Sequence, residues 1–332
     1  EHIEEAGIHS GDSSCTLPPI TLGPDVIAKV KEATEAIARG TGVRGLINIQ
    51  FAYVSENLFV IEANPRASRT VPFVSKATGV QLAKAAVMIG LGKSIAELKA
   101  EGYLPDSMDG ASLPQDTAIA VKAAVLPFSR FRTPEGVVVD SLLSPEMRST
   151  GEVMGLDTHY DTAFAKAQAG AGSPLPTEGK VFVSVANHDK RNVIIYAKML
   201  EQLGFEIVST GGTADVLRRN GVNSTVASKF AEANGQHSIV DMVRNGEIDL
   251  ILNTPAGGAA RSDGYEIRAA AVSVGCPVMT TISEFAAAVQ AITALREHSW
   301  GIISLQEHNE YLHTASSGEQ EDSNQVREGE LS

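Results

Sequence analysis

Cysteine is scarce in this sequence, since only Cys15 and Cys276 occur among its 332 residues. Two cysteines so far apart do not form a disulfide framework, which favours a reducing compartment, and we expect a cytoplasmic protein. The sequence also lacks any apolar run of the roughly 18–20 residues that a membrane helix needs. Its first residues, EHIEEAGIHSGDSS, carry neither the basic nor the apolar stretch of a signal peptide. We therefore expect no membrane partner.

Positive charge is the next deficit, with 27 Lys and Arg against 40 Asp and Glu and a formal net charge of −13. This balance argues against a general nucleic-acid-binding protein, because phosphate backbones favour a basic surface. Single nucleotides remain possible ligands, since they need only a few local donors. Hydrophobic residues make up 43% of the chain, enough for well-packed cores, and the length accommodates two domains. The chain has no initiator Met, and we expect it to be a fragment or a processed piece.

The first half of the chain shows helical and strand periodicities in turn. Two strand-like runs separated by the polar residues Ser-Glu-Asn predict a β-hairpin. The predicted elements are a helix over 22–39, strands over 45–54 and 58–66, a helix over 74–90, a strand over 118–128 and a helix over 158–169.

Residues 170–179, GAGSPLPTEG, concentrate Gly, Pro and Ser and predict a linker. Beyond it strands and helices alternate, a pattern typical of a parallel sheet with helices on both faces, so the fold class is α/β. We predict strands over 181–185, 205–209, 249–253 and 277–281, and helices over 191–203, 214–220, 239–245, 268–274 and 282–297. The predicted domains are residues 1–172 and 173–315, followed by a disordered acidic tail, 316–332.

The predicted hairpin carries a candidate metal and phosphate site. Glu62 and Asn64 are two residues apart and therefore project from one face of their strand, while Gln50 lies on the partner strand. One carboxylate with two amides is an all-oxygen set that suits Mg²⁺. Arg66 and Arg69 follow directly and offer planar donors to phosphoryl oxygens. The alternative is an ordinary solvated hairpin face with surface ion pairs.

The predicted hairpin carries the sequence INIQF…FVIEANPRASRTVPFVSKATG. This segment resembles the metal-binding hairpin of the ATP-grasp enzymes, in the form carried by the family of carbamoyl-phosphate synthetase large subunits. IEEAGIHSGDS and SPEMRSTGEVMG resemble its synthetase halves, and TAFAKAQ with the linker falls where the family joins its last synthetase half to its regulatory domain. The resemblance covers nearly the whole chain apart from the tail. It implies the C-terminal part of an ATP-grasp domain followed by a Rossmann-like, methylglyoxal-synthase-like domain.

The resemblance implies an ATP-dependent ligase that phosphorylates carbamate to carbamoyl phosphate for pyrimidine and arginine biosynthesis, with a glutamine amidotransferase small subunit as partner and an oligomeric full enzyme. It implies ATP and Mg²⁺ or Mn²⁺ as cofactors, and the upstream ATP-binding half is not in this sequence, so we expect the chain alone to be inactive. The positions that match the family's metal ligands are Gln50, Glu62 and Asn64. Those that match its catalytic residues are Arg66, Arg69, Glu62 and Asn64. Those that match its ATP contacts are Gly7, Ile8, His9, Ser10, Gln50 and Glu62.

A second candidate site lies in the predicted C-terminal domain. Thr210-Gly-Gly-Thr213 stands between a predicted strand and a predicted helix, where glycines let N–H groups turn toward an anion. A second Gly-rich loop, residues 253–258, follows another strand, and Lys190 and Lys229 are candidate cations. The alternative is that these loops are empty, as such loops often are in this fold class. The domain resembles methylglyoxal-synthase-like regulatory domains, which implies UMP or IMP as effector at Lys190, Thr210, Thr213, Lys229, Asn253 and Thr254.

Two positions depart from relatives that respond to ornithine. Ala123 stands where those relatives carry an acidic residue, and Val278 stands where they carry a tyrosine, although Glu4 and Asp12 remain. We therefore expect ornithine to have little effect.

Three other functions are alternatives to this one. Another ATP-grasp ligase is disfavoured by the appended domain with STGGTA. A ligand-binding module without chemistry describes the fragment in part. A free-standing methylglyoxal synthase would not need the residues before Gly170, and formation of methylglyoxal from dihydroxyacetone phosphate would favour it.

Overall fold

The computed structural model describes residues 1–105, 118–131, 138–228, 238–254, 257–297 and 299–316. These residues fall into two compact units. The larger unit contains residues 1–16 and 119–300, and the smaller unit contains residues 17–118 and the segment from 301 onward. The predicted tail, 316–332, lies outside the described residues beyond Ser316. The structure places residues 119–172 in the same compact unit as residues 173–300. A compact unit is not the same thing as a family domain, so the predicted domain boundaries stay a prediction.

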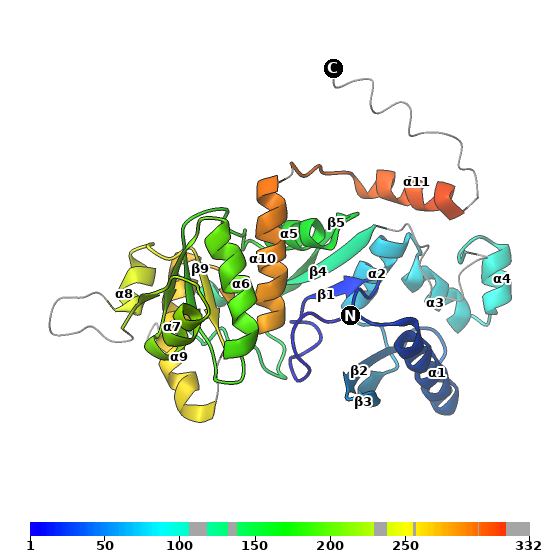
Figure 1. Ribbon diagram of the computed structural model, residues 1–332. Helices are drawn as coiled ribbons and strands as arrows, with labels where there is room; N and C mark the ends of the chain where they lie inside the picture. The colour runs from blue at the N-terminus through cyan, green and yellow to red at the C-terminus, as the bar shows by residue number, and fades with distance from the viewer. Residues whose placement is uncertain (106–117, 132–137, 229–237, 255–256, 298, 317–332) are drawn as a thin grey trace, which may run out of the picture. The chain divides into compact units, whose positions relative to one another are not determined.

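The smaller unit is built from a two-stranded antiparallel sheet and helices (Figure 1). Strands β2 and β3 meet at a tight turn in which Ser55 and Glu56 both have left-handed backbone, with φ of 48° and 65°. Helix α2 contacts α11, and the buried His308 ring lies 3.2 Å from the carbonyl oxygen of Ala77. The elements are α1 (Pro24–Thr41), β2 (Asn48–Val54), β3 (Asn57–Asn64), α2 (Thr70–Thr78), α3 (Leu82–Gly90), α4 (Ile95–Ala100) and α11 (Leu305–Ser316).

The predicted helix over 74–90 is wrong as a single element, because Gly79 interrupts it. Gly79 has φ of 70°, a left-handed conformation that glycine adopts without a steric penalty, and it forms the C-terminal cap of α2. Helix α3 then begins at Leu82. The apolar periodicity continues across this break, which explains why the sequence pattern indicated one helix.

A small sheet in the larger unit has the order β1-β4-β5, with β4 and β5 antiparallel. Helix α5 packs across β4 and β5, and Gly155 makes this close approach possible. A Cβ atom at Gly155 would lie 2.5 Å from the amide nitrogen of Ala167 and would overlap the carbonyl oxygen of Ala163. The elements are β1 (Cys15–Leu17), β4 (Ile119–Val125), the 3₁₀ turn η1 (Phe128–Arg130), β5 (Gly151–Asp157) and α5 (Tyr160–Gly170).

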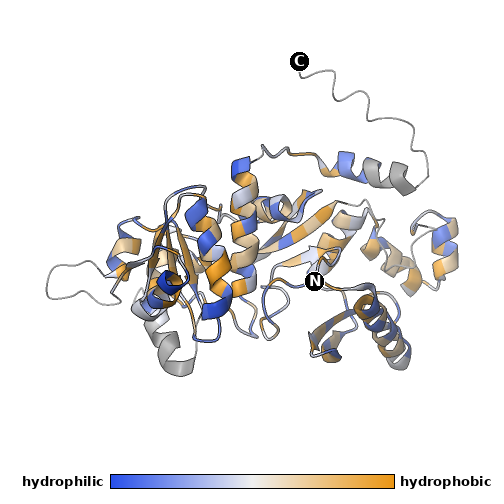
Figure 2. Cartoon of the chain, viewed as in Figure 1, coloured by the Kyte–Doolittle hydropathy of each residue, from blue (hydrophilic) through white to orange (hydrophobic). Residues whose placement is uncertain are grey.

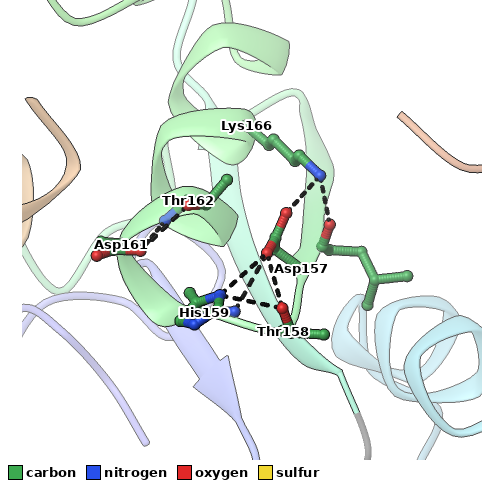
Figure 3. A network of polar contacts seen from close by, with 7 residues as sticks. Asp157, Thr158, His159, Asp161, Thr162 and Lys166 are labelled. Carbon is green, nitrogen blue, oxygen red and sulfur yellow. Dashed lines mark hydrogen bonds and ion pairs between the residues drawn. The ribbon is translucent and has the colours of Figure 1, made fainter. Parts of the chain in front are cut away.

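A network of polar contacts joins the end of β5 to α5 (Figure 3). The carboxylate of Asp157 accepts hydrogen bonds from the His159 N–H at 3.2 Å and from the Lys166 ammonium at 2.7 Å. Lys166 also donates to the carbonyl oxygen of Leu156. Burial opposes ionisation of Asp157, but these donors outweigh it and hold the pKa of the carboxyl below its usual value. The network fixes how the chain leaves the strand and enters the helix.

The second sheet of the larger unit has five parallel strands in the order β10-β9-β6-β7-β8, and the alternating pattern predicted all of them except β8. The chain runs outward from β6 through β7 and β8, and then returns to place β9 on the other side of β6. The elements are β6 (Lys180–Ser184), α6 (Lys190–Gln202), β7 (Glu206–Ser209), α7 (Gly211–Arg219), β8 (Thr225–Val226), α8 (Ile239–Arg244), β9 (Leu250–Asn253), α9 (Gly257–Val274), β10 (Val278–Met279) and α10 (Ile282–Glu297).

Alternate residues of β6 point into two separate cores. Val181 and Val183 pack with residues of α5, α6, α7 and α10, whereas Phe182 packs with residues of α8 and α9 on the other face. Helix α6 is amphipathic to match, and in Figure 2 it carries hydrophilic and hydrophobic residues along its length. The α/β fold class with helices on both faces of a parallel sheet is confirmed. No helix among the residues that the structure describes is long and apolar enough to cross a membrane.

Several elements of the larger unit differ from the prediction. Strands β1, β5 and β8 were not predicted, although residues of β5 belong to one of the family motifs. Helix α9 begins at Gly257, eleven residues before the predicted start at Arg268, so the loop after β9 is shorter than the glycines indicated. Gly257, Gly258 and Gly264 lower the helical propensity of this segment, and tertiary contacts overrule that local preference.

We expect Gly155→Ala to destabilise the protein by about 1–3 kcal/mol or more, because the added methyl group forces β5 away from α5. Gly40→Ala is the matched control, since nothing lies within 4 Å of a Cβ atom there and the site is helical. Urea unfolding of both variants measures the difference. Equal midpoints would contradict the close packing of strand on helix.

Candidate functional site

The predicted metal-binding residues lie together on one face of the β2–β3 hairpin. Gln50 pairs directly with Glu62, and Asn48 pairs with Asn64. Strand residues two apart share a face, so Gln50, Glu62 and Asn64 project to the same side. Asn48, which belongs to no predicted site, projects to this side as well. Glu62 is exposed, and Gln50 and Asn64 are partly exposed.

An irregularity in the hairpin produces this arrangement. The register shifts between Gln50 and Phe51, so that Ile61 has no partner residue on β2. A bulge of this kind redirects the side chains on either side of it, and here it allows Glu62 to face Gln50. The turn sequence alone does not reveal it.

The two predicted arginines follow the hairpin directly. Arg66 is exposed, and its guanidinium donates to the carbonyl oxygen of Ala67 at 3.1 Å. Arg69 is partly exposed at the N-terminal end of α2. Within the described ranges no three His, Cys, Asp or Glu residues cluster as metal ligands. The oxygen set of the hairpin is the carboxylate of Glu62 with neutral amides. One carboxylate with amide oxygens fits Mg²⁺, which commonly keeps water and phosphate in its shell.

The predicted nucleotide-contacting stretch, Gly7, Ile8, His9 and Ser10, belongs to the larger unit. The His9 N–H donates to the carbonyl oxygen of Ser144 at 2.9 Å. The buried ammonium of Lys122 donates to the carbonyl oxygen of Ser10 at 2.9 Å. Asp12 accepts hydrogen bonds from the N–H groups of Arg148 and Ser149, at 2.7 and 2.9 Å. The segment after residue 138 therefore holds the stretch in place.

Five of the six predicted effector residues meet at the carboxyl ends of the central strands of the parallel sheet. Thr210 is the N-cap residue of α7, and its hydroxyl lies 3.4 Å from that of Thr213 and 3.3 Å from that of Ser184. The Lys190 ammonium would lie 3.2 Å from a Cβ atom on Gly212, so it stands beside the first turn of α7. The first N–H groups of a helix have no partner within the helix and attract anions.

Asn253 and Thr254 complete this group from β9. Asn253 pairs with Ser184 across β6 and β9, and the Thr254 hydroxyl accepts from the Ala186 N–H at 2.9 Å. The guanidinium of Arg268 donates to the amide oxygen of Asn253 at 2.7 Å. Ser184 and Arg268 were not selected from the sequence, where neither belongs to a motif. Lys229, the sixth residue, lies outside the described residues.

The glycines of the predicted phosphate loop form the first turn of α7 and are not a free loop, because the helix begins at Gly211. The predicted effector residues lie where β6 separates β7 from β9, so that the strand order reverses there. Parallel sheets commonly bind ligands at such a position. A cation, two hydroxyls and a helix N-terminus together suit a phosphate group.

A cavity of about 270 Å³ in the larger unit brings together the four positions considered for ornithine. Glu4, Asp12, Ala123 and Val278 all line it, and so does Glu284, which was not predicted. Burial raises the pKa of Glu4, although hydrogen bonds from Ser13 and Ser14 oppose the shift. Burial and then the charge of Glu4 raise the pKa of Glu284 to about 8. The weak response to ornithine stays a prediction.

Two family models match the chain. The carbamoyl-phosphate synthase L chain ATP binding domain matches residues 2–98, and the MGS-like domain matches residues 192–280. The chain is therefore of the class that joins an ATP-binding domain of this kind to an MGS-like domain, as the hairpin and the parallel sheet indicated.

The curated relatives are carbamoyl phosphate synthase large chains. The chain is 69% identical over 314 residues to that of Kocuria rhizophila, which covers 94% of this chain and 28% of the relative. It is 65% identical over 321 residues to that of Micrococcus luteus, covering 96% and 29%. It is 59% identical over 315 residues to that of Streptomyces coelicolor, covering 94% and 29%. The chain spans less than a third of the length of these relatives. The predicted family resemblance is confirmed, and the chain is a relative of carbamoyl phosphate synthase large chains.

We expect Glu284→Gln to change how stability depends on pH. The folded protein holds a proton on Glu284 up to a pH of about 8, whereas the unfolded chain releases it near the ordinary value of 4.5. The folded state therefore binds more protons between these values, and stability falls as pH rises through them. Glu284→Gln has no carboxyl to titrate, so its free energy of unfolding does not fall in this way. The variant should therefore become more stable relative to wild type as pH rises from 4.5 to 8.

Urea unfolding of both proteins across this pH range measures the effect. Glu297→Gln, an exposed carboxylate on the same helix, serves as the control and should follow wild type. A constant difference between Glu284→Gln and wild type at every pH would show that the carboxyl titrates normally.

Proposed function

We propose that the protein to which this chain contributes is the large chain of a carbamoyl phosphate synthase, a ligase that uses ATP to phosphorylate carbamate. The supporting observation is that Gln50 and Glu62 face each other within the match to the ATP binding domain. The high identity to large chains over nearly the whole sequence supports the same activity. The product, carbamoyl phosphate, would serve pyrimidine and arginine biosynthesis.

Gln50, Glu62 and Asn64 would hold Mg²⁺ or Mn²⁺, which neutralises phosphate charge when bound. Arg66 and Arg69 would orient the reacting group and stabilise negative charge through their planar donors. The stretch from Gly7 to Ser10 would contact the nucleotide. A carboxylate, amides and arginines placed close together in the sequence are suited to holding a phosphoryl group.

The whole enzyme would act in the cytoplasm as an oligomer. It would receive ammonia from a glutamine amidotransferase small subunit, a partner that the relatives' description as large chains suggests. The MGS-like domain would bind UMP or IMP as a regulatory ligand through Lys190, Thr210, Thr213, Lys229, Asn253 and Thr254. Its support is the cation, hydroxyls and helix N-terminus gathered at the end of the parallel sheet.

In the full-length protein, Glu62→Gln should reduce carbamoyl phosphate synthesis by at least about tenfold, because it removes the only carboxylate of the proposed metal set. Glu56→Gln is the matched control, since Glu56 is also exposed but lies in the hairpin turn. A coupled assay of carbamoyl phosphate formation measures both variants. A Glu62→Gln activity within twofold of wild type would refute the metal assignment.

Nucleotide binding should depend on the phosphate group. UMP and IMP should bind far more tightly than uridine and inosine in calorimetric titrations, because the proposed site presents charge and N–H donors to an anion. Lys190→Ala should weaken UMP or IMP binding by about 1.5–3 kcal/mol, the range for a hydrogen bond to a charged group. Lys198→Ala, an exposed position on the same helix, should leave it unchanged. Equal binding of nucleosides and monophosphates would contradict a phosphate-reading site.

A further inference from the structure

Arg268 is a fully buried arginine whose charge is compensated from two directions. Its Nε and one terminal nitrogen donate to the two carboxylate oxygens of Asp140, at 2.7 and 2.6 Å. Its other terminal nitrogen donates to the amide oxygen of Asn253 at 2.7 Å. Gly264 provides space, because a Cβ atom there would lie 2.6 Å from that amide oxygen and would overlap the guanidinium. Burying such a charge is costly unless it is paired this completely.

The contact with Arg268 fixes the orientation of the Asn253 side chain. A guanidinium only donates hydrogen bonds, so the amide oxygen must face it and the amide nitrogen must point elsewhere. That nitrogen lies 3.4 Å from the carbonyl oxygen of Ser184, at the ends of β6 and β9. The amide nitrogen of Asn253, which donates to that carbonyl oxygen through one N–H, therefore lies in the group of predicted effector residues. A ligand that accepts from this donor strengthens the bond that Arg268 makes to the amide oxygen, because linked hydrogen bonds polarise one another.

Asp140, the second partner of Arg268, lies in a segment that α9 holds firmly. The Tyr265 hydroxyl donates to the carbonyl oxygen of Val138 at 2.6 Å. Asp140 also accepts from the Leu142 N–H. Burial disfavours the charged carboxyl, but the hydrogen bonds from Arg268 and Leu142 outweigh it and keep the pKa of Asp140 below its usual value. The ion pair is therefore intact at neutral pH.

The same segment reaches the predicted nucleotide-contacting stretch at its other end. The Ser144 carbonyl oxygen accepts from His9, and the N–H groups of Arg148 and Ser149 donate to Asp12. The Ser149 hydroxyl adds a contact to the carbonyl oxygen of Gly11 at 3.2 Å. Residues 138–149, which we call the bridging segment, thus contact α9 through their first residues and residues 9–12 through their last.

We propose that Arg268 is a positioning residue for the proposed nucleotide site and that its pair with Asp140 couples this site to the stretch from Gly7 to Asp12 through the bridging segment. The inference rests on the proposed function, because it requires a nucleotide at that site. The guanidinium divides its hydrogen bonds between Asn253 and Asp140. A ligand that accepts a hydrogen bond from Asn253 therefore changes the strength of the Arg268–Asp140 contact, which ties the bridging segment to α9. Such coupling is a free energy shared by the two sites and acts in both directions.

The experiment uses the full-length protein and its Asp140→Asn variant. The apparent KM for ATP in carbamoyl phosphate synthesis is measured without nucleotide and with saturating UMP or IMP, and the ratio of the two values reports coupling. We expect a wild-type ratio that departs from one by at least about fivefold for one of these nucleotides. In Asp140→Asn the ratio should fall to within about twofold of one, while the KM without nucleotide stays within about twofold of wild type.

Asp157→Asn is the matched control, because it breaks the Lys166–Asp157 pair elsewhere in the same unit. It should lower the melting temperature without changing the coupling ratio, which separates a loss of stability from a loss of coupling. If Asp140→Asn does not fold, Arg268→Lys decides the matter. It keeps the charge but cannot contact both oxygens of Asp140 and Asn253 together, and it should lose coupling in the same way.

The outcomes separate this inference from the proposed function. Calorimetry that detects no binding of UMP or IMP to wild type overturns the proposed effector site and this inference with it, while the proposed synthase activity is tested separately by Glu62→Gln. Nucleotide binding with a wild-type ratio near one overturns the coupling alone. An unchanged ratio in a folded Asp140→Asn or Arg268→Lys variant, with nucleotide still bound, also overturns it.

Discussion

The position of β6 between β7 and β9 is the constraint on which the proposed nucleotide site depends. Because the chain leaves β6 in one direction and returns on its other side, the ends of neighbouring strands carry loops that diverge. Ser184, Thr210 and Asn253 come from three such strand ends and would otherwise be far apart. Val181 and Phe182 hold β6 in this position by packing into cores on opposite faces. The order of the strands therefore brings the side chains of this site together.

Buried charge is the second theme of the larger unit, and the two examples differ in kind. Arg268 is buried and Asp140 is partly exposed, and their hydrogen bonds compensate the charge of the arginine and lower the pKa of the Asp140 carboxyl. Glu4 and Glu284 line one cavity, where burial raises the pKa of both carboxyls and the charge of Glu4 adds to the shift of Glu284. The first arrangement favours a defined geometry, and the second ties the protein's stability to pH. Neither contributes to the hydrophobic cores.

The hairpin of the smaller unit shows how far local sequence can determine a candidate site. Alternation placed Glu62 and Asn64 on one face, and the short polar turn brought Gln50 to the partner strand, so the set could be predicted. The bulge at Ile61 and the presence of Asn48 on that face could not, because they depend on the register between strands. Similarly, the break at Gly79 was hidden by an apolar pattern that continues through it.

The sequence by itself determined the α/β class, the parallel alternation after residue 179 and most of the candidate ligands, because these follow from periodicity and short motifs. Only the tertiary structure decided which distant side chains meet. Arg268 and Asp140 are 128 residues apart, and Glu284 faces Glu4 from nearly the opposite end of the chain. No local pattern encodes such pairs, since their contact depends on how whole elements pack and on the space that residues such as Gly264 leave open.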